Sequence, residues 1–360
     1  MTFDLDDIER ALTAGVRQLL ADRHNSVLRR ATLGKRYDEN LWNDLSQSLG
    51  LLPMALPDDI GGDAGGDVLI GLAMREMGRA LYDGPYLSSV VIACGYITAL
   101  DGQVERRDVL SRILDGRLRP TAGPPGSDLG IRVTRDGSGW SLFGVIRPVL
   151  DVDTATHLVV IAELAVDDLG VFLVDLSAPG VQIERLDTFD LTRSMGVVHL
   201  DGAAADLTGT MSGDRLRRLA DRTRIMVASE QIGGAAAVLE LAVEHAQTRH
   251  QFGRPIGSYQ AIKHQCADAL VAIETTLVTV DHALCLLVNG EDVGHIAPMV
   301  AAMSSEAYVQ AATTSLHVHG GMGFTWEHDA HLHLRRAKSS SHLLGSPSAH
   351  RELLLERLGL

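Results

Sequence analysis

The hydrophobic residues of this chain change their spacing twice, and that change constrains the fold more than any other feature of the sequence. From Leu5 to about Arg117 they recur every three to four residues, as in amphipathic helices. Between Pro120 and Leu207 they form short β-rich runs separated by Asp, Gly and Pro, and after Ser212 the helical spacing returns in long segments. This order predicts an α+β multidomain protein with an N-terminal helical bundle, a small antiparallel β-barrel or sandwich in the middle, and a C-terminal four-helix bundle.

The positions of these changes predict the boundaries. The expected domains are 1–118, 119–208 and 209–360. The expected strands lie near 130–133, 140–143, 158–161, 170–174, 181–183 and 197–200. The expected long helices lie near 214–245, 258–289, 296–317 and 329–344, with a short last helix from residue 349.

Composition narrows the class of protein. The net charge of −14 opposes binding to a phosphate backbone, so we expect no nucleic-acid partner. The widely spaced Cys94, Cys266 and Cys285 suit reduced thiols rather than disulfides or a zinc site. The acidic start of the chain, Met1 to Glu9, does not resemble a signal peptide, and no run of eighteen uncharged apolar residues occurs. We expect a cytoplasmic protein without membrane insertion.

The segment from Arg249 to Gly257 contains side chains suited to a dinucleotide. Arg249 offers a planar fork of donors for a diphosphate, Gln251 an amide and Phe252 an apolar face for an aromatic ring system. A surface ion pair is the alternative for Arg249.

The segment from His319 to Phe324 is rich in glycine. Gly320, Gly321 and Gly323 would allow backbone N–H groups to approach an anionic ligand. A tight turn between helices would explain these glycines equally well. The glycine-rich loop from Leu56 to Gly66 has the same two interpretations, a plain connector or a loop that approaches a ligand.

These segments resemble the acyl-CoA dehydrogenase family, and the resemblance extends over almost the whole chain. Besides the two segments above, it rests on Gly50-Leu51-Leu52, Leu56 to Gly62 and the three-part order of the domains. The segment from Gly323 to Asp329 is similar to a branch common in actinobacteria, which includes enzymes of steroid side-chain degradation. The resemblance implies an acyl-CoA substrate, FAD as cofactor and an electron-transfer flavoprotein as a partner.

The same resemblance implies a role for individual residues. In the family, the two segments hold the adenosine diphosphate half of the FAD of a neighbouring subunit. The residues implied here are Arg249, Gln251, Phe252, Tyr259, Gln260, His317, Gly320 and Gly321. His317 stands where the family usually has glutamine, although an imidazole can still donate a hydrogen bond. Asp221 and Arg224, three residues apart on one helical face, either bind the CoA thioester or pair with each other.

The catalytic base of the family is missing. Removal of the α-proton from a thioester needs a proton acceptor, and the two positions from which the family supplies its glutamate are Leu344 and Thr223 here. Glu230 lies two helical turns beyond Thr223, so it is either a displaced base or part of a buried ion pair or hydrogen bond.

Residues implied to face the chain's own flavin have also diverged. The loop from Thr121 to Asp128 keeps only the Gly-Ser-Asp ending of the family's pattern, and Pro148 to Asp151 lacks the usual tryptophan and threonine. The losses affect the residues implied to face the chain's own flavin and substrate, whereas the residues implied to hold a neighbour's cofactor are mostly kept. This difference indicates a heteromeric assembly. We expect a heterotetramer in which a paralogous catalytic subunit carries the glutamate. The alternatives are a self-sufficient dehydrogenase with a displaced base, and a scaffold protein without flavin.

A metal site is not expected among the crowded histidines near the C-terminus. His328 and His331 share one helical face, whereas His333 points away and no cysteine accompanies them.

Overall fold

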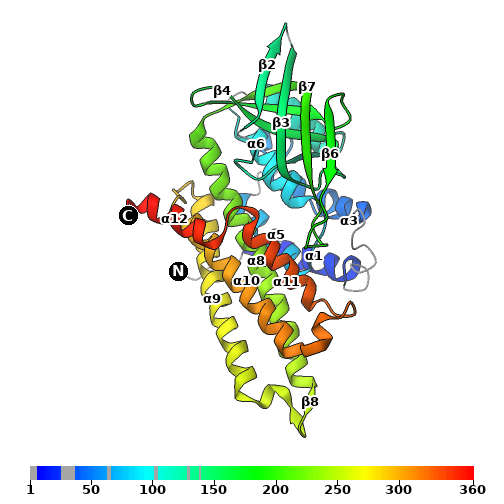
Figure 1. The fold of residues 1–360 in the computed structure, drawn as a ribbon, viewed down its shortest axis with the longest axis vertical. Coiled ribbons are helices and arrows are strands. Elements are labelled where there is room, and N and C mark those ends of the chain that lie inside the picture. Colours follow the sequence, from blue (N-terminus) through cyan, green and yellow to red (C-terminus); the bar gives the residue numbers. More distant parts are fainter. Residues whose placement is uncertain (1–5, 26–36, 63–65, 101–103, 128–129, 138) are drawn as a thin grey trace.

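The computed structural model describes residues 6–25, 37–62, 66–100, 104–127, 130–137 and 139–360. Asp128 and the middle of the Leu56 to Gly66 loop lie outside the described residues. Helices come first along the chain, then strands, then long helices (Figure 1), which confirms the α+β class expected from the sequence. In Figure 1 the strands β2, β3, β4, β6 and β7 lie at one end of the molecule, and the long helices extend to the opposite end, where β8 lies.

Helical segments precede the sheet. They are α1 (Asp7–Arg23), α3 (Glu39–Asn43), η1 (Asp44–Ser48), α4 (Leu51–Met54), η2 (Asp58–Ile60), α5 (Gly66–Arg79), η3 (Tyr86–Ala93), α6 (Cys94–Thr98) and α7 (Val104–Leu114). α1 begins with a reciprocal cap, in which the backbone N–H groups of Asp6 and Glu9 each donate to the other's carboxylate at 2.8 Å. Its buried face is formed by Leu12, Val16 and Leu20.

The middle of the chain forms one sheet that folds over a core of its own. Its strands are β1 (Pro120–Ala122), β2 (Arg132–Asp136), β3 (Gly139–Leu150), β4 (His157–Ala165), β5 (Asp168–Asp175), β6 (Val181–Arg185) and β7 (Met195–Met211). The first half of β7 pairs with β3 and β6, and its second half pairs with β5. All these pairs are antiparallel except β1 with β4, so the structure adds a parallel strand that the sequence did not predict.

Both faces of β4 are buried. Leu158 and Val160 contribute to the core inside the sheet, while Val159 and Ile161 pack into the main core with the N-terminal helices. Because successive side chains of a strand point to opposite faces, this strand joins the two cores. This burial on both faces explains why the sequence of β4 is a continuous apolar run.

The C-terminal part is a bundle of long helices. Its elements are α8 (Gly213–Thr248), β8 (His250–Gln251), β9 (Arg254–Pro255), η4 (Ile256–Ser258), α9 (Gln260–Val288), α10 (Ile296–His319), η5 (Gly320–Phe324), α11 (Ala330–Leu343) and α12 (Pro347–Leu358). α8 begins after Ser212, whose side chain accepts a hydrogen bond from the N–H of Arg215. α8 packs against α5 with almost no space between the backbones, since a Cβ on Gly78 would lie 1.9 Å from the carbonyl oxygen of Glu230.

Two helices are long and apolar enough to span a membrane by length and composition alone, α8 and α9. The apolar stretch of α8 is 78% buried inside the protein, so it serves as a core helix. The apolar stretch of α9 is only 28% buried, and Leu270, Val271 and Val278 are at least 49% exposed on its outer face. A large apolar face of this kind indicates a surface that another molecule covers.

Candidate functional site

The β8–β9 hairpin lies at the end of α8 far from the seven-stranded sheet (Figure 1), and its turn carries an exposed phenyl ring. The turn residues Phe252 and Gly253 both have positive φ, 53° and 79°, which matches the tight two-residue turn of a hairpin. Phe252 is 92% exposed. A bulky side chain held in the left-handed region without any burial is uncommon in a purely structural turn, so this ring is a candidate ligand contact.

The glycines after α10 have different roles. A Cβ on Gly320 or Gly321 would meet no described atom within 4 Å, and the φ of Gly320 is 59°, so the backbone here is open to a ligand. A Cβ on Gly323 would instead lie 2.9 Å from the Cβ of His319. Gly323 is therefore required by packing, which is the second interpretation that the sequence left open.

The hairpin, the start of α9 and the end of α10 together line an open hollow of about 540 Å³. It is lined by His245, Arg249, Gln251, Phe252, Ile256, Tyr259, Ala261, Ile262, His317, Val318, His319 and Gly320. Six of the eight residues proposed for cofactor binding are in this set, while Gln260 and Gly321 are exposed and adjacent to it in sequence. The hollow has the volume of an ordinary ligand pocket and combines a cation, an amide and imidazoles with apolar walls.

Arg249 is available to an anion. It is exposed, and within the described part of the chain no acidic side chain forms an ion pair with it, which argues against the surface ion pair left open by the sequence. Its neighbour Arg254 is engaged differently, with its guanidinium 4.1 Å from the centre of the Tyr259 ring. Arg254 thus positions Tyr259, whereas Arg249 forms no ion pair with an acidic side chain among the described residues.

The sequence did not single out two imidazoles of this hollow. His245 lies one helical turn before Arg249 on α8, and His319 is the last residue of α10. Their rings stack with centroids 4.4 Å apart. The spacing of four residues between His245 and Arg249 was the signal that could have identified the first of them.

Asp221 and Arg224 pair with each other. Arg224 Nη1 donates to Asp221 Oδ1 at 2.8 Å, and Arg357 Nη1 of α12 donates to Asp221 Oδ2 at 2.9 Å. Burial raises the pKa of Asp221, and the two guanidinium groups oppose this shift. The structure therefore shows that Asp221 and Arg224 pair with each other. Arg357 is a third member of this group, which the sequence did not reveal.

The two positions that correspond to the family's base contain no proton acceptor. Leu344 caps α11 and packs against the main core. Thr223 is fully buried, and its hydroxyl donates to the backbone oxygen of Leu219 at 2.8 Å.

Glu230 belongs to a buried polar cluster that connects all three parts of the chain. Both of its oxygens accept hydrogen bonds from Arg193 Nη2 at 2.7 Å, and Arg336 Nη1 of α11 donates to Oε1. Burial alone would raise the pKa of Glu230, but the charges of Arg193 and Arg336 outweigh burial and lower it. The buried ion pair is thus the correct interpretation of Glu230, because a carboxylate held by two guanidinium groups is a poor proton acceptor.

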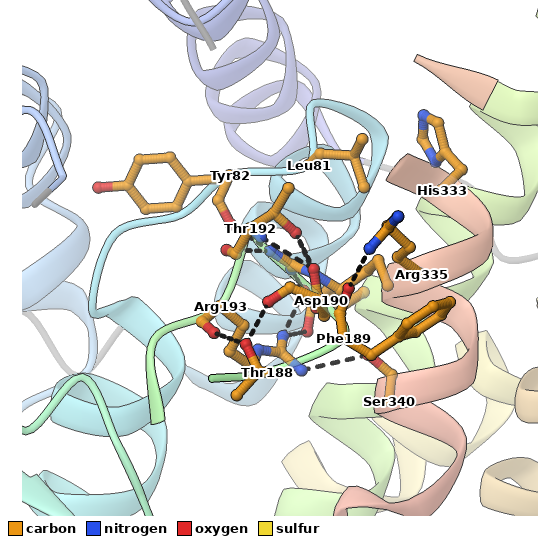
Figure 2. Close-up of polar contacts among 12 residues, drawn as sticks. Leu81, Tyr82, Thr188, Phe189, Asp190, Thr192, Arg193, His333, Arg335 and Ser340 are labelled. Atoms are coloured by element: carbon orange, nitrogen blue, oxygen red, sulfur yellow. Dashed lines mark hydrogen bonds and ion pairs between the residues drawn. The ribbon is translucent and has the colours of Figure 1, made fainter. Parts of the chain in front are cut away.

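Figure 2 shows how the rest of this cluster is built. Asp190, Thr192 and Arg193 come from the loop before β7 (Figure 2), and Arg193 Nη1 donates to Ser340 Oγ of α11 at 3.2 Å. Arg336 Nη2 donates to the backbone oxygen of Tyr82 at 3.0 Å. Arg336 Nε lies 3.0 Å from Asp190 Oδ2 and 2.9 Å from Thr192 Oγ1. The cluster satisfies its buried charges with several partners each, which is the condition under which buried ion pairs are tolerated.

Beside Glu230 there is almost no free space. The cavity lined by Tyr82, Tyr86, Asp151, Arg193 and Glu230 has about 20 Å³, room for roughly one water molecule. Asp151 accepts a hydrogen bond from Ser88 Oγ at 2.6 Å, and burial raises the pKa of Asp151 to about 6. No thioester could reach Glu230 through a space of this size.

Comparisons with known proteins agree with this architecture. Residues 215–359 match the family model described as "Acyl-CoA dehydrogenase, C-terminal domain". The chain is 30% identical over 312 residues to the acyl-CoA dehydrogenase IpdE2 of Mycobacterium tuberculosis, covering 86% of this chain and 84% of the relative.

Two similar solved structures are two-component complexes by their descriptions. One is a variant of the Tcur3481-Tcur3483 steroid ACAD, with a TM-score of 0.88, 30% identity, and coverage of 98% of this chain and 97% of that one. The other is the ChsE4-ChsE5 complex from Mycobacterium tuberculosis, with a TM-score of 0.90, 26% identity, and coverage of 100% and 99%.

Proposed function

Because the chain belongs to the acyl-CoA dehydrogenase family, we propose that it is the non-catalytic subunit of a heteromeric, FAD-dependent enzyme that desaturates an acyl-CoA thioester. A paralogous subunit supplies the catalytic glutamate, and this chain completes the dinucleotide site of that partner. The observation that carries the proposal is the contrast between Arg249, which is exposed in an open hollow and has no acidic partner among the described residues, and Leu344, a partly buried apolar residue at the position where the resemblance places the base.

The residues of the hollow fit the adenosine diphosphate half of FAD. Arg249 binds the diphosphate with its planar fork of donors, while Gln251 and His317 donate hydrogen bonds to the polar edges of the nucleotide. Phe252 and Tyr259 supply apolar faces for a ring, and the backbone N–H groups near Gly320 approach an anion without steric hindrance. When bound, FAD supplies the hydride acceptor of the reaction.

The assembly is supported by the exposed apolar face of α9 and by the relatives. The names of the Tcur3481-Tcur3483 and ChsE4-ChsE5 structures each describe two different chains together, so we propose a heterotetramer of two subunit types here. The first of these is called a steroid enzyme, and on that ground we propose a steroid-derived thioester as substrate. Asp221, Arg224 and Arg357 form a charged group that remains a proposed contact for the CoA portion.

The test is expression of the chain alone and together with a neighbouring paralogous gene. We expect the lone chain to be colourless and unable to reduce a dye with an acyl-CoA, and the copurified complex to be yellow and active. Turnover by the lone chain would show that a base exists within it and would overturn the proposal. A complex that forms but remains colourless would instead favour a scaffold role without flavin.

A further inference from the structure

Three imidazole rings from three different elements stack at the edge of the hollow. The ring centroids of His245 and His319 are 4.4 Å apart with an angle of 26° between the planes. His328, in the segment before α11, adds a third ring 4.1 Å from that of His319. His245 and His319 also line the hollow together with Arg249, so the stack forms part of the proposed dinucleotide site.

The hydrogen bonds of the stack define where protons can be added. His319 Nδ1 lies 2.7 Å from the carbonyl oxygen of Ser315, which can only accept, so Nδ1 carries the proton and a second one must go to Nε2. His328 Nδ1 accepts the backbone N–H of Ala330 at 3.2 Å, so its own proton is on Nε2. Both rings are therefore compatible with the neutral form.

In the absence of an anion, the surroundings of His245 and His319 disfavour the charged forms of these two rings. Burial lowers the pKa of His245, and the nearby charges of His319 and Arg249 lower it further. Burial likewise lowers the pKa of His319, against the effect of its hydrogen bond to Ser315. The titratable and charged groups on the elements packed around the stack are Arg249 of α8, Tyr259 and Lys263 at the start of α9, His317 of α10, and Glu327 and Asp329 beside His328.

We propose that His245 and His319 are further ligands of the diphosphate and that the imidazole stack takes up a proton when the dinucleotide binds. This inference rests on the proposed function of the hollow. A diphosphate carries more negative charge than Arg249 alone can neutralise, and an anion next to an imidazole favours its charged form. His328 contacts the ring of His319 with its own ring tilted by 51° and the centroids 4.1 Å apart.

The sign of the pH dependence follows. Proton uptake on binding means that a lower pH favours the bound state, so nucleotide affinity rises as pH falls. One proton taken up corresponds to as much as about a tenfold gain in affinity per pH unit, in the range between the pKa of the free and of the bound site. Its lower end, the pKa of the free site, is below the ordinary histidine value of about 6.5.

The experiment is titration calorimetry of the copurified complex after flavin removal, with ADP as the probe and adenosine as the uncharged comparison. Titrations near pH 7 in buffers of different ionisation enthalpy measure the protons taken up per nucleotide. We expect uptake with ADP, none with adenosine, and ADP affinity that falls several-fold between about pH 6 and pH 8.

Substitutions separate the stack from the rest of the site. His245→Asn should reduce proton uptake and weaken ADP binding several-fold at pH 6, with little effect at pH 8. His199→Asn, at a partly exposed position on β7 far from the hollow, should behave as the wild type. His319→Asn is the second variant, because an amide can retain the bond to the Ser315 carbonyl.

The possible outcomes distinguish the two proposals. ADP binding with pH-independent affinity and no proton uptake would overturn the role of the stack and leave the cofactor function standing. Absence of ADP binding at any pH would overturn both. Equal proton uptake in the wild type and His245→Asn, if the His319→Asn variant also matches them, would assign the uptake to other groups and refute the inference.

Discussion

At the scale of single residues, the chain differs from a complete dehydrogenase in the identity and the contacts of a few side chains. Leu344 and Thr223 occupy the positions where the resemblance places the family's proton acceptor; Leu344 packs on the main core, and the Thr223 hydroxyl donates a hydrogen bond within α8. Glu230 is acidic and buried, but it is committed to Arg193 and Arg336. Residue identity alone left open whether Glu230 is a displaced base. Its two arginine partners show that it belongs to a buried ion pair.

We predict that Arg249→Ala weakens flavin retention by the reconstituted complex. A charge-assisted hydrogen bond to a phosphate contributes about 1.5–3 kcal/mol, so the dinucleotide should dissociate at least roughly tenfold more readily. Arg218→Ala is a matched control, since Arg218 is 78% exposed and pairs with Asp214. The measurement is flavin released during dialysis, and equal retention by both variants would contradict the role of Arg249.

We also predict that Leu344→Ala leaves the turnover of the complex nearly unchanged. The side chain packs on the main core but is only partly buried, so the expected cost is in stability, about 1–2 kcal/mol. Urea unfolding of the lone chain and steady-state rates of the complex measure the two effects separately. A large loss of turnover at unchanged stability would place this residue in the chemistry after all.

At the scale of elements, the buried polar cluster connects α8, α11 and the loop before β7. We predict that Glu230→Gln lowers the free energy of unfolding by roughly 3 kcal/mol, because it leaves two buried guanidinium groups without their shared counter-charge. Glu240→Gln is the control, since Glu240 forms a similar pair with Arg79 but is 63% exposed. Denaturant unfolding of both variants measures the difference.

The effect of Glu230→Gln on the free energy of unfolding should depend on pH. The pKa of Glu230 is lower in the folded protein than its ordinary value of about 4.3, so its contribution is complete above that value. It is lost as the pH falls through the folded pKa. The stability gap between wild type and Glu230→Gln should therefore be constant from about pH 8 to pH 5 and narrow below about pH 4. A gap that stays constant throughout acid titration would contradict the ion pairing.

At the scale of the whole molecule, the exposed apolar face of α9 is the surface most in need of a partner. We predict that Val278→Glu prevents copurification with the paralogous subunit without lowering the stability of the lone chain, because Val278 is 65% exposed. Val166→Glu is the matched control, at a 92% exposed valine between β4 and β5. Copurification of both variants in equal yield would exclude this face from the interface.

The sequence by itself determined the three-part architecture and most of its long elements. Hydrophobic spacing is a local property, so α8 to α11 could be placed to within a few residues. The strands β2 to β7 were located, but β3 and β7 extend well beyond the predicted ends, to Leu150 and Met211. The sequence also proposed Arg249, Phe252 and Gly320 as one site, and these residues line the same hollow.

Only the tertiary structure decided which residues meet. Arg193 and Arg336 are 143 residues apart in the sequence, and nothing local in either segment indicates that both contact Glu230. The same is true of His245, His319 and His328, whose rings come together only because α8, the end of α10 and the segment before α11 converge. Ion pairs and ring stacks act over about 4 Å in space regardless of separation along the chain, so a local pattern can suggest a charge or a ring but not its partner.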